Sequence, residues 1–506
     1  MSQESISRPS TPPTRTSSSA RASLTLDHVW LAAALILLAL RPLFSPIPPH
    51  DFWWHMATGR LIVNTGAIPT VDGFSYTQFG QPFFNQSWLA EVLMYGLYWL
   101  GGIELIVLAQ SLIIVLAYGL LLRLCLVASG SIRLSVVLIL VVMLVSFSNW
   151  SVRPQSYTFP LFAAFVMILA NYRAGRSNRL WLLPLLMVLW VNMHGAFVLG
   201  LALIGITFVG ELLKRVVRGA TAAPPAALLP LVIWGALSGL ATLINPRGVG
   251  VLGYVRSLLG SSSVTTLVTE WAPPTLRDAD GSGAIFFIFV MGCVAVLAYV
   301  RQRPDLTDML LFGAFFWLAL GASRNIVWIG FVVAPLLATQ LASAQPKAST
   351  KRRPSGSPML NGVLIGVLGL LVLLGLPWIK PHLGLPPSVG GLLSEDTPVA
   401  AVEALRAQNA RPQRLFHTEA YGSYLIWAAP EQPVFIDTRI ELYPYEQWND
   451  YIMLSQGLQV EQLLQKYGFD GFLLNKERQN GLIEHLKAMP GWITQFEDEQ
   501  TIYLSR

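Results

Sequence analysis

The stretch IPPHDFWWHMATGRLIVNTG, Ile47 to Gly66, directly follows the first apolar run of the chain and brings together an acid, two tryptophans and a histidine. A carboxylate at the end of a membrane helix is costly to desolvate, so Asp51 should face water, a cation or a cavity. Asp51 and His55 are four residues apart, so on a helix their side chains share a face. The apolar spacing after His55 predicts an amphipathic helix along the membrane surface, with Gly66 as its C-terminal stop.

The same stretch has a plainer interpretation. Trp53 and Trp54 lie at a membrane boundary, where the amphipathic rings of tryptophan commonly form an interfacial belt. Asp51 could equally be a solvated loop residue. The stretch therefore predicts the end of a membrane helix with a polar cluster, and its chemistry has to be judged from the rest of the chain.

The composition is that of a polytopic membrane protein. Of the 506 residues, 53% are hydrophobic and only 12% are charged, and the mean hydropathy is +0.53, whereas a soluble protein has about 25% charged residues. The formal charge of +6 comes from short basic clusters between apolar runs, where such residues orient membrane spans. Nucleic acid is therefore not an expected partner. Cys125 and Cys293 both fall within apolar segments and predict no disulfide framework.

Apolar runs predict about eleven membrane spans, since a span needs about 20 apolar residues. Residues 1–26 are rich in Ser, Thr, Pro and Arg, and we expect them to form a disordered cytoplasmic tail. No small-residue cleavage site follows the first run, so this run is expected to be an uncleaved anchor. The candidate spans are residues 27–45, 103–123, 134–149, 156–172, 180–192, 196–213, 226–244, 284–300, 308–322, 325–343 and 360–379.

The positive-inside rule gives these spans a direction. With the N-terminus in the cytoplasm, the inner loops hold more Lys and Arg than the outer loops, which favours this topology over its mirror image. The polar clusters then fall in five outer loops, on one face of the membrane. They are Asp51, His55 and Asp72 in the first loop, Arg153 in the second, Asn192 and His194 at the third, Asn245, Arg247 and Glu270 in the fourth, and Arg324 in the fifth. A concave polar site on the outer face is the expectation.

The chain changes character after Lys380. Residues 27–380 are expected to form the transmembrane domain, with residues 47–100 as its first outer loop, and residues 381–506 a soluble domain on the outer side. Alternating apolar strands and helical stretches predict a small α/β fold there. The predicted strands are Arg414 to His417, Pro433 to Asp437, Gly471 to Leu474 and Thr501 to Leu504, and the predicted helices are Val399 to Arg406, Gln459 to Tyr467 and Leu482 to Met489. In this domain Asp437 and Arg439 are expected to form a structural ion pair.

The first outer loop resembles that of a known superfamily. An acid after the first span, an aromatic pair, a helix that ends in Gly and then IPTVDGFSY, Ile68 to Tyr76, are similar to the first outer loop of GT-C membrane glycosyltransferases, in particular the catalytic subunits of oligosaccharyltransferases. VTTLVTEWAPPT, Val264 to Thr275, is similar to a loop of those subunits that carries a catalytic Glu. NWSVRPQSYTFPLF, WVNMHGAF, LINPRGVG and SRNIVWIG together resemble bacterial multi-pass proteins that are placed near this superfamily.

The resemblance implies roles for particular residues. It implies a GT-C-like fold and a polyprenyl-phosphate-linked sugar as donor, with Asp51 and Glu270 as catalytic residues or as ligands of a divalent cation such as Mg²⁺ or Mn²⁺. Arg153 and Arg324 are candidates for binding the lipid phosphate, because a guanidinium binds phosphate bidentately; both could instead be arginines that extend to lipid headgroups. His194 and His55 are further phosphate-binding candidates, and His194 could instead make a helix-pairing hydrogen bond. Secondary candidates are Asp72, Asn192, Asn245 and Arg247.

Three functions remain open on the sequence. The first is a glycosyltransferase that moves a sugar from a polyprenyl phosphate carrier to a glycan, lipid or protein acceptor at the outer face of the bacterial cytoplasmic membrane. The second is a membrane protein without activity that binds a lipid-linked glycan or serves as an assembly subunit. The third is a transporter, which is disfavoured because transporters place ionisable groups near the midplane, whereas here most lie at outer helix ends.

Overall fold

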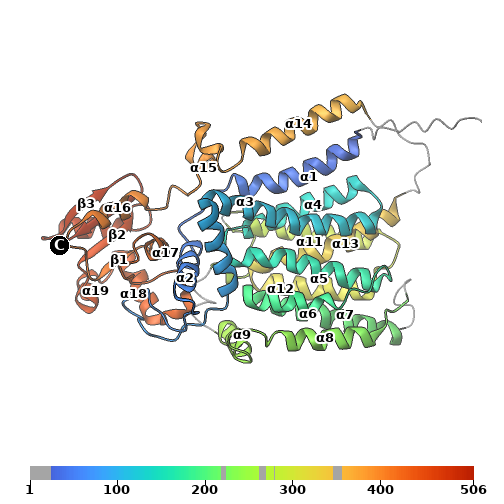
Figure 1. Ribbon diagram of the computed structural model, residues 1–506, viewed down its shortest axis with the longest axis horizontal. Helices are drawn as coiled ribbons and strands as arrows, with labels where there is room; N and C mark the ends of the chain where they lie inside the picture. The colour runs from blue at the N-terminus through green and yellow to red at the C-terminus, as the bar shows by residue number, and fades with distance from the viewer. Residues whose placement is uncertain (1–23, 218–223, 261–268, 279, 346–355) are drawn as a thin grey trace, which may run out of the picture.

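A helical bundle and a smaller α/β unit lie end to end along the long axis of the molecule (Figure 1). The computed structural model describes residues 24–217, 224–260, 269–278, 280–345 and 356–506. The predicted disordered tail falls mostly on residues 1–23, which lie outside this part of the chain. The arrangement leaves one end of the bundle facing the α/β unit, and the polar loops meet at this end.

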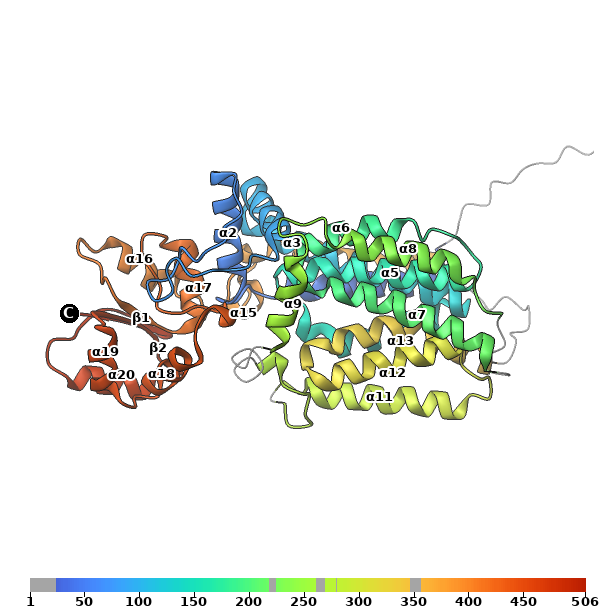
Figure 2. The same cartoon turned by 90° about the horizontal axis from the view of Figure 1, so that it is seen from below.

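An apolar helix occupies the position of every predicted span. Among the described residues, six helices are long and apolar enough to cross a membrane, and four more are shorter apolar helices. The eleventh, α5 (Thr158–Arg173), has 16 residues, belongs to neither group and lies within the bundle (Figure 2). The predicted class, a polytopic helical membrane protein with a C-terminal α/β unit, is thus confirmed, whereas the number of crossings stays a prediction. The helices are α1 (Leu26–Leu43), α3 (Trp88–Ser129), α4 (Ile132–Ser146), α5 (Thr158–Arg173), α6 (Leu182–Met193), α7 (Val198–Val216), α8 (Leu228–Ala241), α11 (Ser282–Tyr299), α12 (Leu306–Gly321), α13 (Ile326–Ala344) and α14 (Pro358–Leu374).

Helix α13 lies at the centre of the bundle. It packs against α3, α4, α11 and α12, and nearly all its side chains from Ile326 to Ala338 are buried. Short helices cap the ends of the longer ones at the loops. These are η1 (Phe147–Asn149), η2 (Pro154–Tyr157), η3 (Gly195–Phe197), α9 (Gly250–Gly260), η4 (Thr269–Trp271), η5 (Ser323–Asn325), η6 (Lys380–His382) and α15 (Pro387–Gly390).

A buried ionic network closes the bundle at the end away from the α/β unit. Arg173, at the end of α5, bonds to Glu211 of α7 at 3.0 Å and to Asp305 and Asp308 at the start of α12 at 2.5 Å each. Lys214 bonds to the same Glu211 and Asp305 at 2.7 and 2.5 Å. Three helices are thus tied together where they leave the apolar layer, because buried charges need partners.

The first outer loop begins with α2 (Phe52–Thr65), which runs across the bundle axis (Figure 1). The helix ends at Gly66 as predicted, since Gly66 has φ 68° and its N–H bonds to Ile62. At Gly59 the helix touches the start of α3, where a Cβ would lie only 2.2 Å from the carbonyl oxygen of Glu91. This close approach fixes α2 against α3. Further along, α3 breaks at Gly101 and Gly102, which leave helical geometry.

The interfacial belt predicted for the two tryptophans is wrong. Trp53 and Trp54 are only 2% and 8% exposed and belong to a core shared by α2 and the α/β unit. The ring of Trp53 packs edge-on against Tyr424, with ring centroids 4.9 Å apart. The sequence could not reveal this, because the cover comes from a segment nearly 400 residues away in the chain.

The α/β unit contains a four-stranded sheet in the order β1-β2-β4-β3. Strand β1 (Leu415–His417) is parallel to β2 (Gly471–Asn475), which is antiparallel to β4 (Thr501–Ser505), and β4 is antiparallel to the edge strand β3 (Ile493–Glu497). The helices are α16 (Val399–Ala407), α17 (Glu419–Ala428), η7 (Ile440–Leu442), α18 (Tyr445–Ser455), α19 (Val460–Tyr467) and α20 (Asn480–Ala488).

The strand predicted at Pro433 to Asp437 is wrong, because this segment bonds to the first outer loop and not to the sheet. Val434 N–H donates to the carbonyl of Phe74 and its own carbonyl accepts from Tyr76, both at 3.1 Å. The remaining three predicted strands and three predicted helices lie where the structure has β1, β2, β4, α16, α19 and α20. Strand β3 was not predicted, because its side chains are mostly exposed and lack an apolar alternation.

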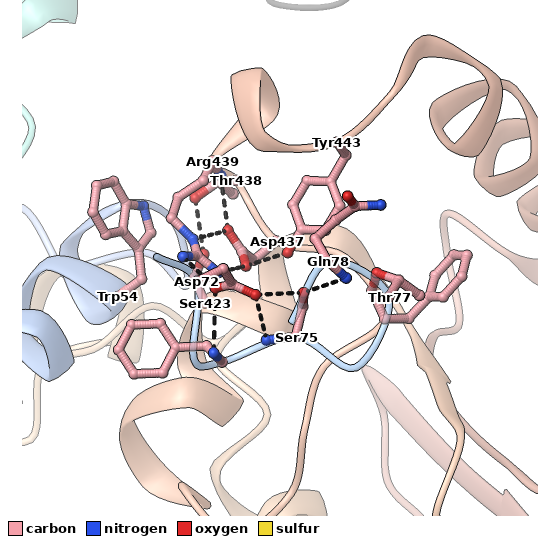
Figure 3. Close-up of polar contacts among 12 residues, drawn as sticks. Trp54, Asp72, Ser75, Thr77, Gln78, Ser423, Asp437, Thr438, Arg439 and Tyr443 are labelled. Carbon is pink, nitrogen blue, oxygen red and sulfur yellow. Dashed lines mark hydrogen bonds and ion pairs between the residues drawn. The ribbon is translucent and has the colours of Figure 1, made fainter. Parts of the chain in front are cut away.

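An arginine cluster locks the α/β unit to the first outer loop (Figure 3). Arg439 forms ion pairs with Asp437 at 2.6 Å and with Asp72 of the loop at 2.7 Å, and all three side chains are at most 1% exposed. Tyr443 donates to Asp437 at 2.5 Å, and Asp72 also accepts from the hydroxyl and the N–H of Ser75. The structural pair expected for Asp437 and Arg439 is present. Asp72 adds a second ion pair to Arg439, so its side chain joins the first outer loop to the α/β unit.

Candidate functional site

Four charged side chains from four separate loop segments meet at the end of the bundle. Arg153 binds Glu270 bidentately, with Nη1–Oε1 and Nη2–Oε2 distances of 3.1 and 2.8 Å. Asp51 contacts the same guanidinium, with its Oδ2 at 3.7 Å from Nη1. Arg324 lies 3.6 Å from Oε1 of Glu270. The structure therefore brings together Asp51, Glu270, Arg153 and Arg324, four of the residues singled out from the sequence.

Each of these residues is positioned by a specific local feature. Asp51 is the residue that precedes α2, so the packing of α2 on α3 sets its place. Arg153 is fully extended immediately before Pro154, which begins η2. The loop before it is held by Gln110 of α3, whose amide donates to the carbonyl of Trp150 at 2.9 Å and to the hydroxyl of Ser156 at 3.0 Å.

The Glu270 segment is tied directly to the Arg324 segment. Ser323 N–H donates to the carbonyl of Ala272 at 2.9 Å, and the Ser323 hydroxyl donates to the carbonyl of Glu270 at 3.2 Å. The guanidinium of Arg324 stacks over the ring of Trp271 at 4.7 Å and donates to Gln155 at 3.3 Å. These bonds hold the segments of Glu270 and Arg324 against each other.

The charges of the cluster fix its protonation. Burial alone would raise the pKa of Glu270, but Arg153 and Arg324 outweigh it and hold that pKa at about 2. Burial would lower the pKa of Arg153, but Glu270 and then Asp51 raise it. At neutral pH the cluster therefore holds an ionised Glu270 against a protonated Arg153.

His194 lies near the two arginines as a neutral imidazole. Burial, Arg324 and Arg153 lower the pKa of His194 to about 3. Its Nδ1 accepts a hydrogen bond from the N–H of Ala196 at 3.1 Å. The proton of the neutral ring is then on Nε2, so His194 can donate one hydrogen bond without adding charge.

His55 is held one helical turn after Asp51 by a buried carboxyl group. Its Nδ1 lies 2.7 Å from Oε1 of Glu91, and the other oxygen of Glu91 accepts from the amide of Asn85 at 2.6 Å. Burial, followed by the nearby His194 and Arg153, lowers the pKa of His55 well below its ordinary value. His55 is thus a neutral ring that Glu91 holds in place near Arg153 and His194.

The other sequence candidates are not part of this cluster. Asn192 accepts from the indole of Trp88 at 2.9 Å and donates to the carbonyls of Val188 and Ile244, so it joins helix ends. Asn245 bonds within its own turn. Arg247 donates to the carbonyl of Phe83 at 3.0 Å and stacks over the ring of Phe84. Asp72 belongs to the junction with Arg439.

Sequence reasoning missed three residues at the site. Glu91 is fully buried at the start of α3, and a lone acid in the apolar run WLAEVLMYGLYWL could have indicated a buried partner. Gln155 was passed over although it follows Arg153 by two residues. Desolvation and then the charge of Asp51 raise the pKa of Glu441 in η7, so the α/β unit brings a carboxyl group within electrostatic reach of Asp51. Nothing in the sequence around Glu441 predicts this.

The residues around Asp51 and Glu270 do not fit a divalent cation. Both oxygens of Glu270 are bonded to Arg153, whereas Mg²⁺ and Ca²⁺ need free oxygen ligands. Within the part of the chain that the structure describes, no group of three or more His, Cys, Asp or Glu side chains could hold a metal ion. The cluster as built is a four-membered ionic site without a place for a cation.

Comparison with solved structures identifies the architecture. The fold is similar to that of the oligosaccharyltransferase of Archaeoglobus fulgidus, with a TM-score of 0.54 over 89% of this chain and 69% of that one at 13% identity. It is also similar to ArnT from Cupriavidus metallidurans, solved with undecaprenyl phosphate, with a TM-score of 0.52 over 94% of this chain and 97% of that one at 12% identity. The fold is the GT-C fold.

The GT-C fold predicted from the first outer loop is thus confirmed, and it covers nearly the whole chain. The Archaeoglobus protein AglB has also been solved with an inhibitory peptide and a dolichol-phosphate. No protein-family model matches the sequence, and no curated protein is similar to it. At this level of identity the likeness extends to the fold alone.

Proposed function

We propose that this protein is a membrane glycosyltransferase that moves a sugar from a polyprenyl-phosphate-linked donor to an acceptor. The observation that carries the proposal is the convergence of Asp51, Arg153, Glu270 and Arg324 at one end of a GT-C fold. Two proteins with a similar fold have been solved with a polyprenyl phosphate, AglB with a dolichol-phosphate and ArnT with undecaprenyl phosphate. A donor with an anionic phosphate and an apolar chain suits a basic site at the end of a membrane bundle.

The proposed reaction needs one base and a bound phosphate. The bond between the sugar C1 and the phosphate oxygen breaks, a bond from C1 to the acceptor oxygen forms, and the acceptor proton passes to a carboxylate. The polar contacts of Arg324, at 3.6 Å with Glu270 and 3.3 Å with Gln155, are longer than the bidentate contacts of Arg153 with Glu270, so Arg324 is the more available guanidinium for the phosphate. The positive charge stabilises the leaving phosphate as its negative charge grows.

Asp51 is the proposed base. Its side chain is 33% exposed and its ion pair with Arg153 is long, at 3.7 Å, so an acceptor hydroxyl can approach it. Glu270 is bound on both oxygens, and its proposed role is to hold Arg153 in place. Neutral His194 can donate a hydrogen bond to a phosphate oxygen. No step of the proposal involves a metal ion.

The proposed location is the outer face of the bacterial cytoplasmic membrane. This rests on the distribution of Lys and Arg among the loops, which puts the site and the α/β unit outside. A membrane-impermeant reagent should label a tag at Arg506 in cells whose outer membrane has been made permeable but whose cytoplasmic membrane is intact. Labelling only after lysis would put the site on the cytoplasmic side.

The test of the activity is a single acid-to-amide change. In reconstituted vesicles with a radiolabelled polyprenyl phosphate sugar, Asp51→Asn should lower transfer about 100-fold or more while the protein still folds. The matched control is Asp27→Asn at the far end of the bundle, where Asp27 pairs with Arg133 in an exposed position. This control should transfer as the wild type does.

Two results would speak against the proposal. Undiminished turnover by Asp51→Asn would remove Asp51 from the mechanism. A wild-type protein that binds the donor but transfers nothing to any acceptor would favour the binding or assembly role.

A further inference from the structure

The contacts of Arg153 resemble those of a bridging cation. Its guanidinium lies between two carboxylates that come from different outer loops, Glu270 at 2.8 Å and Asp51 at 3.7 Å. The side chain is only 14% exposed, so water screens these charges weakly. One guanidinium thus links two acids that would otherwise repel each other.

The bridge occupies the oxygen atoms that a metal would use. Glu270 gives both of its oxygens to Arg153, and Arg324 adds a second positive charge at 3.6 Å. A divalent cation takes about six oxygen ligands and is repelled by nearby positive charge. Entry of a cation would require Arg153 to leave both carboxylates.

The segment directly before Glu270 adds no acidic, histidine or cysteine side chain by sequence. Residues 261–268, which precede Glu270 and lie outside the described chain, have the sequence SSSVTTLV and contain no Asp, Glu, His or Cys. Glu441 is a further carboxyl group that interacts electrostatically with Asp51. The described residues form no group of three or more His, Cys, Asp or Glu side chains that could hold a metal ion, and Arg153 engages the two carboxylates with which such a site would begin.

The Nε–H group of Arg153 is a further hydrogen-bond donor. Its Nε is buried and has no hydrogen-bond partner among the described residues. A buried N–H without a partner is costly, and it gains most from a ligand oxygen. This donor belongs to the same guanidinium that bridges the two acids.

We infer that Arg153 supplies at this site the positive charge that a bound divalent cation would otherwise supply, so that the protein needs no metal ion. Arg153 holds Asp51 and Glu270 together and offers its remaining donor to the phosphate of the donor lipid. No proton or electron is transferred to it in this role. The phosphate part of the inference rests on the proposed function, but the exclusion of a cation does not.

Metal binding can be tested without any transfer assay. Mn²⁺ is titrated into the purified full-length protein in detergent and followed by electron paramagnetic resonance of the free ion. The wild type should show no saturable Mn²⁺ binding that depends on Glu270. Arg153→Ala frees Asp51 and Glu270 and should bind Mn²⁺ about 10-fold or more tightly than the wild type. The double variant Arg153→Ala/Glu270→Gln should lose this gain.

A matched control separates the bridge from general charge. Arg324→Ala removes the same charge but leaves the bidentate Arg153–Glu270 pair intact, so it should gain little Mn²⁺ binding. Saturable binding of Mn²⁺ to the wild type that Glu270→Gln abolishes would overturn the inference. So would the absence of any gain in a folded Arg153→Ala protein, with Arg153→Gln as the substitute if the alanine variant does not fold.

Transfer provides a second and distinct readout. If the wild type transfers sugar, its rate should be unchanged by a chelator such as EDTA, and loss of transfer that Mn²⁺ restores would overturn the inference. If the wild type transfers nothing, the proposed function fails while the Mn²⁺ titration still decides the question of the cation.

Discussion

Arg439 and Arg153 each lie between two carboxylates, and the two clusters differ in exposure. Arg439 is 1% exposed and its partners Asp72 and Asp437 are fully buried, whereas Asp51 and Glu270, the partners of Arg153, are 33% and 32% exposed. Three aromatic rings, those of Trp54, Phe74 and Phe83, surround Arg439 within 6.0 Å. The same three-charge motif is thus sealed at one place and open to a ligand at the other.

The difference assigns the two clusters to different tasks. A sealed ion pair whose partners are all satisfied contributes to the fold and offers no group to a substrate. The cluster of Arg153 is partly exposed, its Nε has no partner among the described residues and Asp51 contacts it only at 3.7 Å, so it can bind and release a ligand. The same substitution at the two arginines should therefore have opposite consequences.

The largest effect is expected for Arg439→Met. The substitution leaves Asp72 and Asp437 buried without a counter-charge, which should cost about 3–5 kcal/mol of stability. We expect little folded protein, measured by size-exclusion chromatography and thermal unfolding in detergent. A stable, monodisperse Arg439→Met protein would contradict the structural role of the cluster.

Arg153→Met should keep the fold and lose the activity. Glu270 keeps Arg324 as a partner and contact with water, so the loss of stability should be clearly smaller than that of Arg439→Met. Transfer should fall about 100-fold or more, as expected when a group that stabilises developing charge is removed. Equal losses of stability in the two methionine variants would remove the distinction between the clusters.

Glu91→Gln tests whether the position of His55 matters to the open cluster. The amide keeps the size of the side chain but changes the hydrogen bond to His55, so α2 should remain packed while Asp51 and His55 lose their fixed placement. We expect kcat to fall about 10-fold to 100-fold with a small change in KM. The neighbouring Glu104→Gln, in the same helix beyond the break, serves as the control and should behave as the wild type does.

The smallest effect is expected in the pH dependence of stability. Glu270 has a folded pKa of about 2 against an ordinary 4.5, so below 4.5 the unfolded chain binds the proton more readily. Its contribution to stability is complete above pH 4.5 and is lost as the pH falls toward 2. The melting temperature of Glu270→Gln should therefore fall less steeply than that of the wild type between pH 4.5 and 3. Parallel curves would mean that Glu270 is not held ionised in the fold.

The spans and the shared face of the site could be predicted from the sequence. A membrane requires long apolar runs, and the bias of Lys and Arg between loops groups Asp51, Arg153, Glu270 and Arg324 on one side. Their mutual contacts could not be predicted, because these depend on how four loops fold against each other. Trp53 and Trp54 were misjudged because the α/β unit covers them, and the same unit buries Asp72 in its pair with Arg439.

The buried network at the other end of the bundle has a mechanical consequence. Arg173, Glu211 and Asp305 join α5, α7 and α12 at the ends farthest from Arg153, His194 and Arg324. The ion pairs therefore fix each of these three helices at the end farthest from the site. Helix displacements that admit a donor lipid should be largest at the opposite ends, where the arginines of the site lie. They should become smaller toward the ends that the ion pairs join.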